Sequence, residues 1–556
     1  MSLYSSARGG RLALAFTAFS ILALLLLIGF PVLSVVLFAI FPDFNTGSFS
    51  APFSNFIPQL SDPSLISAAA NSIRLAASVT LCSALVSVLL AYCRSKMRPT
   101  MGRVWDLVLL VPFLIPPYIG SMAWIQIFQF NGVFYRWTGL DLSGFLFSFS
   151  GMVFVMTLHL FPLVYFSTSN ALRVIGSRYS DVARVYGAGR WVLAVRILLP
   201  LLMPTLLASG LMVFVLSVEE FGTPEILGNS FGFEVLVTAI EAKLTDWPID
   251  LPGASVLSLL LMALAISAYA LQSLLARKYA ANLETQTLNA TRPVSNRVHW
   301  LSQLPFVVVM LLAVCVPILT IIISSLMRTV SRGVSWDNLT FDAYRTLFDA
   351  DNDALHAILT SLGLAALTAV IAVFLGLLIA FMLIRLKPKG HSLLDMLALM
   401  PNAIPAMALA VGLILMWNQQ WLPVTPYNTL GILVLAYICL MLPYPIRMIT
   451  TALRQQPVSL DESAAIYGAN MLTIIRTILL PLMVPIMISS GCIVFAISTR
   501  ELVSSLMLAP AGTETVATYV FNQFDQGSIS AGMAMSLVVI LLSGALMALG
   551  QKLSKR

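Results

Sequence analysis

The stretch "ARVYGAGRWVLAVRILLPLLMP", residues 183–204, decides how this chain is built, because it occurs twice. Its second copy, "AAIYGANMLTIIRTILLPLMVP", occupies residues 464–485, which lie 281 positions later. Both copies run from a polar segment through Tyr-Gly-Ala into an apolar segment with Ile-x-Leu-Pro and a second proline. Because the same segment occurs once in each half, the chain is predicted to be a tandem repeat.

The composition predicts an all-α integral membrane protein. Of the 556 residues, 59% are hydrophobic and 10% are charged, and the mean hydropathy is +0.92. A soluble globular chain carries about 25% charged residues. A membrane-spanning helix needs about 20 mainly apolar residues. Twelve segments meet that length: 12–40, 69–93, 104–130, 148–170, 193–217, 254–276, 301–326, 357–386, 392–417, 427–450, 474–497 and 530–551.

The basic residues predict the orientation in the membrane. If both termini are cytoplasmic, most of the 31 Lys and Arg residues fall in cytoplasmic loops, which is the bias of membrane proteins. Examples are "RSKMRPTMGR" (94–103), "RLKPK" (385–389) and the tail "KLSKR" (552–556). The net charge of +7 therefore reflects the orientation of the chain in the lipid bilayer, and it says nothing about nucleic-acid binding.

The repeat extends over both halves of the chain. With six spans in each half, the two copies have the same orientation, so a pseudo-two-fold axis runs along the membrane normal and a translocation path lies between the halves. The predicted domains are 1–276 and 301–556, joined by a polar cytoplasmic linker at 277–300. Matching positions are Asp106/Asp395, Pro112/Pro401 and Pro116/Pro405 at a spacing of 289, and Pro200/Pro481, Ser217/Ser498 and Glu220/Glu501 at a spacing of 281.

Each copy of the opening segment predicts a short cytoplasmic helix followed by a sharp turn. The helices are expected at 181–186 and 462–467, with an acidic residue near the positive end of the helix dipole. Gly187 and Gly468 allow the turn. Two such helices related by symmetry are what a symmetric cytoplasmic partner would bind. The alternative is that each helix only anchors its loop at the membrane surface.

The segment resembles the EAA-x3-G-x9-I-x-L-P pattern that marks permease subunits of bacterial ABC importers. The first copy has Asp and Val in place of Glu and Ala, and the second has Ser in place of the first Ala. The resemblance implies docking on a homodimeric ATP-binding subunit, a periplasmic substrate-binding protein on the outer segments 218–253 and 499–529, and location in the bacterial inner (plasma) membrane. The matching residues are Asp181, Ala183, Gly187, Ile197 and Pro200, and Glu462, Ala464, Gly468, Ile478 and Pro481.

The chain itself is not expected to be an enzyme. It contains no GxxxxGK[ST] phosphate-binding loop, so ATP and Mg²⁺ belong to the separate ATP-binding subunit and no cofactor is expected on this chain. The five cysteines and four histidines are scattered along the sequence and have no metal-ligand spacing. No metal site is assigned to them.

The substrate follows from resemblance alone. Two fused permease cores resemble the ferric-iron importers, and "ELVSSLMLAPAGTETVATYVFNQFDQG" (501–527) is most similar to that branch. Fused permeases for thiamine and 2-aminoethylphosphonate are the alternatives within the family. From other classes, a secondary transporter or a channel would need no ATPase, and a secondary transporter would carry ionisable residues in mid-span.

Two Ser–Glu pairs at the outer ends of the fifth spans are the candidates for the substrate path: Ser217 with Glu220, and Ser498 with Glu501. Carboxylates doubled by symmetry could contact a hard cation through oxygen. Alternatively, Arg500 pairs with Glu219 or Glu501 and holds an outer gate closed. Pro112, Pro116, Pro401 and Pro405 are expected either to kink their helices or to break them.

Overall fold

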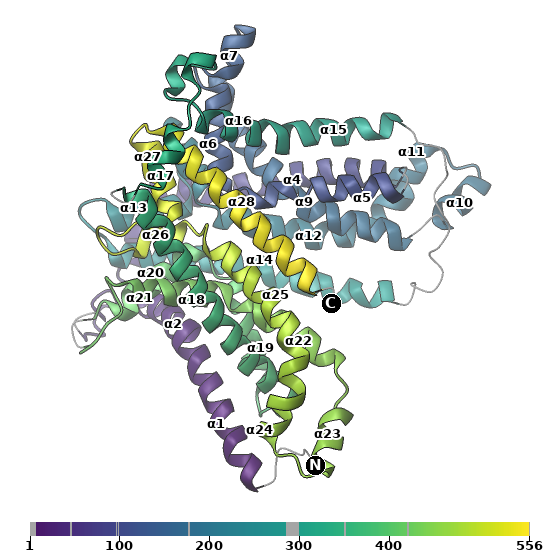
Figure 1. The fold of residues 1–556 in the computed structure, drawn as a ribbon, viewed down its shortest axis with the longest axis vertical. Helices are drawn as coiled ribbons and strands as arrows, with labels where there is room; N and C mark the ends of the chain where they lie inside the picture. Colours follow the sequence, from purple (N-terminus) through teal and green to yellow (C-terminus); the bar gives the residue numbers. More distant parts are fainter. Residues whose placement is uncertain are drawn as a thin grey trace. The chain divides into compact units, whose positions relative to one another are not determined.

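The computed structural model describes residues 7–44, 47–95, 97, 99–175, 178–284, 300–349, 352–419 and 422–554. Within these ranges the chain is helical, with a single isolated β-bridge between Met327 and Leu339 and no strand (Figure 1). The predicted all-α fold is confirmed. Residues 285–299 of the predicted linker lie outside the described ranges.

The predicted membrane spans are confirmed for most of the chain. Among the described residues, nine helical segments are long and apolar enough to cross a membrane, or up to twelve if three bent helix pairs each count as one span. The nine are Ala13–Ile40, Pro63–Arg94, Phe149–Ile175, Leu193–Glu219, Leu251–Leu275, Leu301–Ser325, Asp353–Leu386, Met471–Ser498 and Ile529–Gly550.

Three predicted spans are pairs of helices with a bend between them. Met101–Leu114 and Pro117–Thr138 meet at 94°, and His391–Asn402 and Ala406–Trp417 meet at 108°. At the bends, Pro116 and Pro405 have extended ψ angles of 140° and 139°, and a proline offers no N–H to continue a helix. These two prolines are therefore helix breaks. The third pair, Leu430–Met441 and Pro443–Gln455, bends by 42°.

The chain forms two compact units that do not follow chain order. We call residues 1–59, 243–262 and 342–556 the C-half unit, and residues 60–242 and 263–341 the N-half unit. The first span of each sequence repeat thus belongs to the unit built mainly from the other repeat. The predicted boundaries 1–276 and 301–556 describe the repeat in sequence, and they stay a prediction.

The N-half unit is built around α4, α9 and α12, which pack on one another. Phe161 and Tyr165 of α9 are fully buried at the centre of its core, and α16 packs against α6. The helices are α4 (Pro63–Arg94), α5 (Pro99–Val108), η4 (Val111–Leu114), α6 (Pro117–Phe128), α7 (Val133–Thr138), α8 (Ser143–Leu146), α9 (Phe149–Ile175), α10 (Arg178–Val185), α11 (Arg190–Val192), η5 (Leu193–Leu198), α12 (Leu199–Glu219), η6 (Pro224–Gly228), η7 (Asn229–Phe231), η9 (Trp300–Gln303), α15 (Leu304–Met310), η10 (Leu311–Cys315), α16 (Val316–Ser325), η11 (Val330–Arg332) and η12 (Trp336–Asn338).

In the C-half unit, α18 and α25 pack on each other and on α22, and α2 packs against α20. Gly412 allows that last contact, because a Cβ there would lie 2.5 Å from the carbonyl oxygen of Pro31. Its helices are α1 (Ala7–Leu24), η2 (Leu25–Gly29), α2 (Phe30–Ile40), α3 (Phe56–Ser61), α17 (Asp342–Leu347), α18 (Asp353–Phe381), η13 (Met382–Leu386), α19 (His391–Leu399), η14 (Met400–Asn402), α20 (Ala406–Trp417), α21 (Leu430–Met441), α22 (Pro443–Gln455), α23 (Ser459–Ile466), α24 (Met471–Ile474), η15 (Ile475–Leu479), α25 (Leu480–Ser498), α26 (Val503–Leu508), α27 (Val516–Asp525) and α28 (Ile529–Ser554). Two helices, α13 (Leu236–Thr245) and α14 (Leu251–Glu284), contribute residues to both units.

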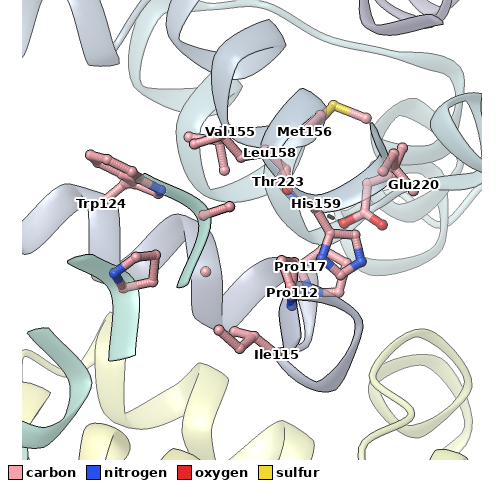
Figure 2. Close-up of a pocket in the computed structure, with 14 residues that line it drawn as sticks. Pro112, Ile115, Pro117, Trp124, Val155, Met156, Leu158, His159, Glu220 and Thr223 are labelled. Carbon is pink, nitrogen blue, oxygen red and sulfur yellow. Dashed lines mark hydrogen bonds between the residues drawn. The ribbon is translucent and has the colours of Figure 1, made fainter. Parts of the chain in front are cut away.

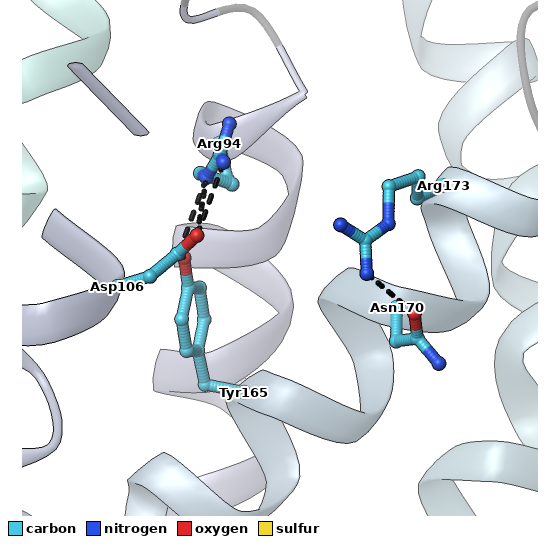
Figure 3. A network of polar contacts seen from close by, with 5 residues as sticks. All are labelled: Arg94, Asp106, Tyr165, Asn170 and Arg173. Carbon is cyan, nitrogen blue, oxygen red and sulfur yellow. Dashed lines mark hydrogen bonds and ion pairs between the residues drawn. The ribbon is translucent and has the colours of Figure 1, made fainter. Parts of the chain in front are cut away.

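A polar network joins three helices of the N-half unit (Figure 3). Arg94, at the end of α4, donates to Asp106 of α5 over 3.0 Å, and the Tyr165 hydroxyl of α9 donates to the same carboxylate over 2.6 Å. Charge-assisted hydrogen bonds of this kind are the stronger ones in proteins. The network therefore fixes the predicted cytoplasmic end of α4 to α5 and α9.

Candidate functional site

Both predicted short helices are present, α10 in the N-half unit and α23 in the C-half unit. Gly187 and Gly468 follow them with φ angles of +77° and +82°, a conformation that favours glycine. Behind each glycine, the next amide donates back to the motif alanine: Ala188 N to Ala183 O over 2.9 Å, and Ala469 N to Ala464 O over 3.0 Å. This is the Schellman end of a helix, and it explains the Ala-x3-Gly spacing.

The ends of these two helices expose matching large side chains. Tyr186 is 86% exposed and Tyr467 is 91% exposed, and each follows an exposed aliphatic residue, Val185 or Ile466. Exposed apolar and aromatic side chains at symmetry-matched places favour a protein-binding surface. The side chain of Asp181 lies outside the described part of the chain, whereas Glu462 is exposed on α23.

The remaining residues of the motif lie where each fifth span begins. Ile197 and Ile478 belong to single π-helical segments, η5 and η15, and Pro200 and Pro481 follow as the second residues of α12 and α25. A proline ring clashes with the carbonyl four residues earlier in a regular α-helix, and π turns inside α-helices are often functional. A π turn therefore precedes the proline in each copy of the motif.

One contact at α23 was not predicted from the sequence. Asp461, in the first turn of α23, is fully buried and pairs with Arg385 of η13, with Nε and Oδ2 2.8 Å apart. Arg385 also donates from Nη2 to the carbonyl oxygen of Gln456 over 3.2 Å. The first repeat has Ser180 at the place of Asp461. The only sequence signal was an acidic residue directly before Glu462.

Glu220 directly follows α12 and lines a small cavity of about 30 Å³ in the N-half unit (Figure 2). His159 of α9 and Thr223 line the same cavity, together with Trp124 and Pro112. The Glu220 carboxylate accepts a hydrogen bond from the Thr223 amide over 3.2 Å. The sequence analysis did not connect His159 to this site, since 61 positions separate it from Glu220 and no spacing pattern links them.

Glu501 has the same local geometry in the C-half unit. Its Oε2 accepts from the amides of Ser504 and Ser505 over 2.9 and 3.3 Å, at the start of α26. Both glutamates therefore cap the helical segment that follows them, as a side-chain oxygen does at a helix N-terminus. Burial raises the pKa of each carboxyl to about 7, while the amide hydrogen bonds act in the opposite direction.

Ser217 and Ser498 lie in the last turns of α12 and α25 and are almost fully buried. Their hydroxyls have no hydrogen-bond partner among the described residues, so neither hydroxyl bonds to the carboxylate of the glutamate three residues later. Within the described ranges, no group of three or more His, Cys, Asp or Glu residues could hold a metal ion. The predicted roles of the two Ser–Glu pairs stay predictions.

Comparison with known proteins gives the family. The family described as "Binding-protein-dependent transport system inner membrane component" matches residues 83–281 and 372–556, one match in each sequence half. The chain belongs to this family. It is a multi-pass bacterial inner-membrane permease with two fused cores, as the repeated motif indicated.

Two relatives of this permease are similar over most of its length. It is 22% identical to the ferric transport system permease protein FbpB of Actinobacillus pleuropneumoniae, over 95% of this chain and 77% of that protein. It is 24% identical to the ferric transport system permease protein FbpB 1 of Haemophilus influenzae, over 90% and 79%. It is also 27% identical to the 2-aminoethylphosphonate transport system permease protein PhnV of Salmonella paratyphi A, over 37% of this chain and 78% of that protein.

Proposed function

We propose that this permease imports ferric iron, delivered by a periplasmic binding protein, and that a separate homodimeric ATP-binding subunit docks on α10 and α23. The observation that carries the docking assignment is the pair of equivalent helix ends. Each has a Schellman turn at glycine and an exposed tyrosine, Tyr186 or Tyr467. A homodimer presents two identical surfaces, and two equivalent helices match them.

Iron is supported by the extent of the similarity. The ferric permeases match 90% or more of this chain, whereas the phosphonate permease matches 37%. The carboxylates of Glu220 and Glu501 follow the fifth spans, and anionic oxygen suits a hard cation. 2-Aminoethylphosphonate is the second candidate substrate. Over the 37% of this chain that it covers, PhnV is 27% identical, whereas the two ferric permeases are 22% and 24% identical over their longer matches.

The proposed orientation puts both termini, α10 and α23 in the cytoplasm and the segments 218–253 and 499–529 outside. The binding protein would dock on these outer segments. In 218–253, the Asp250 carboxylate binds Lys243, Gln59 and the Gly253 amide over 2.9, 3.1 and 2.7 Å. Although burial acts against it, these donors lower the pKa of Asp250. The outer end of α14 is thus held by a charged network.

Transport in proteoliposomes tests the proposal. The permease is reconstituted with its ATP-binding subunit, and uptake of labelled ferric iron on its binding protein is compared with uptake of labelled 2-aminoethylphosphonate and thiamine. We expect iron uptake that requires ATP and the ATP-binding subunit. Uptake that persists without that subunit would identify a secondary transporter or a channel. ATP-dependent uptake of another solute alone would keep the permease function and reject iron.

A further inference from the structure

A second cavity lies in the C-half unit, between α22, α25 and η14. It is open and has a volume of about 400 Å³. No acidic side chain lines it, and its most prominent polar group is a guanidinium. The lining residues are Asn402, Pro443, Tyr444, Arg447, Met448, Thr451 and Ile486.

The cavity is bounded by the polar face of an amphipathic helix. On α22, Ile446, Ile449 and Leu453 are buried against the unit, while Arg447 and Thr451 are exposed on the other side. An arginine at the centre of a lipid-facing helix costs about 2.5–3.5 kcal/mol on insertion scales, and less near the end of the helix. Since α22 completes a predicted span, its exposed polar face is expected to line water and to avoid lipid.

Two of the donor groups in this cavity, on Arg447 and Asn402, have no acceptor among the residues that the structure describes. The Arg447 guanidinium makes no ion pair or hydrogen bond with any residue in the described ranges, and the same holds for the Asn402 side-chain amide. The Thr451 hydroxyl donates to the backbone carbonyl oxygen of Arg447 over 2.8 Å, so this hydrogen bond does not involve the guanidinium. A guanidinium has five N–H donors in a fork that fits two oxygens of a carboxylate or phosphonate.

The first repeat shows that the fold does not require the polar side chains of Asn402, Tyr444 and Arg447. Helices α9 and α22 align at the spacing of 281, with Pro162 matching Pro443 and Arg173 matching Arg454. In that alignment Phe166 occupies the place of Arg447. Leu163 occupies the place of Tyr444. At the spacing of 289, Phe113 occupies the place of Asn402. An arginine that served only to pack the repeat would be expected in both copies.

We propose that Arg447 and Asn402 form a subsite in the translocation path that binds the oxyanion of a small substrate, either a phosphonate or a carboxylate. The subsite rests on the proposed permease function and narrows its substrate class. Because the guanidinium repels a bare trivalent cation, ferric iron would pass this point only with anionic oxygen ligands around it. An organic phosphonate would bind through its own oxygens.

The local charge of the cavity can be measured without transport. A reporter, Thr451→Cys, is placed in the full-length permease after its five native cysteines are replaced, and the protein is reconstituted in phosphatidylcholine nanodiscs. Its reaction rates with an anionic and a cationic methanethiosulfonate reagent are compared with and without Arg447→Gln. One charge about 6 Å away in a partly aqueous site changes such a rate ratio by about tenfold. Methylphosphonate is the probe ligand, and ethanolamine is its cationic control.

We expect Arg447→Gln to lower the anionic-to-cationic rate ratio by about tenfold. Methylphosphonate should slow labelling of the reporter at least threefold and ethanolamine should not, and Arg447→Gln should abolish this protection. Arg447→Lys should keep the rate ratio but weaken the protection, because an ammonium lacks the fork. Arg454→Gln, a matched change about two turns further along α22, should keep the protection.

Three results would overturn the subsite. One is a reporter that reacts with neither reagent while a cysteine at Tyr467 reacts with both, which would place the cavity against lipid. Another is a rate ratio that does not depend on Arg447. The third is an anionic-to-cationic rate ratio that falls in phosphatidylglycerol nanodiscs, together with no protection of the reporter by methylphosphonate. That result would identify a lipid-headgroup site. A permease that passes these tests but shows no ATP-driven uptake would contradict the proposed function and leave the subsite intact.

Discussion

Arg385 and Asp461 form a buried ion pair, 2.8 Å between Nε and Oδ2, that fastens α23 to η13, the segment that continues α18. The first repeat has Ser180 in the place of Asp461, and its own ion pair, Arg94 with Asp106, joins α4 to α5 instead. The ion pair of Asp461 therefore has no counterpart at Ser180 in the sequence of the first repeat. A movement of α18 would reach α23 through a direct charged contact that α10 does not have at the equivalent position.

Neutralising Asp461 should destabilise the permease strongly. Asp461→Asn leaves the Arg385 guanidinium buried without its counter-charge, and breaking a buried pair in this way costs about 3–5 kcal/mol. The matched control is Glu462→Gln, since the adjacent Glu462 is exposed and its neutralisation should cost under about 0.5 kcal/mol. Thermal unfolding of the purified variants measures both. Equal melting temperatures for the two would show that the pair does not hold α23.

The glycines behind the docking helices should not accept a side chain. A Cβ at Gly187 or Gly468 would meet nothing within 4 Å, so the cost of Gly→Val comes from the positive φ alone, about 1–2 kcal/mol or more for a β-branched residue. The expected result is a displaced docking helix and ATP hydrolysis uncoupled from uptake. The second-half variant should have the larger effect, because its motif is closer to the family pattern.

Gly189→Val is the control for these variants. Gly189 also has open space around it, and its φ lies outside the positive region. ATP hydrolysis and uptake are measured on each variant assembled with the ATP-binding subunit. Normal coupling in Gly187→Val and Gly468→Val would show that the turns are not part of the docking surface.

Gly412 should be required for the contact between α2 and α20. A Cβ at this position would lie 2.5 Å from the Pro31 carbonyl oxygen, so Gly412→Ala forces two helix backbones apart. Overpacking of this kind costs about 1–3 kcal/mol. Gly363→Ala on α18 is the control, because its Cβ would meet no atom within 4 Å. A melting temperature that falls no further for Gly412→Ala than for Gly363→Ala would contradict the packing of α2 on α20.

Hydropathy and the repeated motif predicted the spans and the two short helices, because both signals are local. The exchange of the first spans between the units is not local. It depends on close approaches such as Gly412 with Pro31, and a uniformly apolar helix carries no pattern that marks its neighbour. The pair of Arg385 and Asp461 spans 76 positions for the same reason. Arg447 lies three residues before the predicted end of the span 427–450, where a basic residue is normally an anchor at the membrane surface.

Cysteine labelling in intact cells tests the orientation. Asn229 lies in η7, within the segment proposed to face outward, and Ser295 lies in the linker proposed to be cytoplasmic. A cysteine at Asn229 should react with an impermeant thiol reagent, and one at Ser295 should react only after the cells are opened. The reverse pattern would invert the topology and move the docking helices outside.

Replacing Glu220 and Glu501 by glutamine should separate charge from helix capping. A glutamine carbonyl oxygen can still accept the amide hydrogen bonds that Glu220 and Glu501 accept from Thr223, Ser504 and Ser505, so the fold and the docking of the ATP-binding subunit should be retained. If the carboxylates contact iron, each single variant should import less iron and the double variant none. Uptake of 2-aminoethylphosphonate should rise or stay unchanged, because its phosphonate would be repelled by the carboxylates.

The pH dependence of uptake gives an independent measure of the same charges. A carboxyl with a pKa of about 7 is about one-tenth ionised at pH 6 and about nine-tenths ionised at pH 8. Iron uptake by the wild-type permease should therefore rise over this range, and each single variant should show a weaker rise. Uptake is expressed per unit of ATP hydrolysis, so that the pH response of the ATP-binding subunit cancels. Undiminished iron uptake by the double variant, with the wild-type pH profile, would leave Glu220 and Glu501 as helix caps that do not contact the substrate.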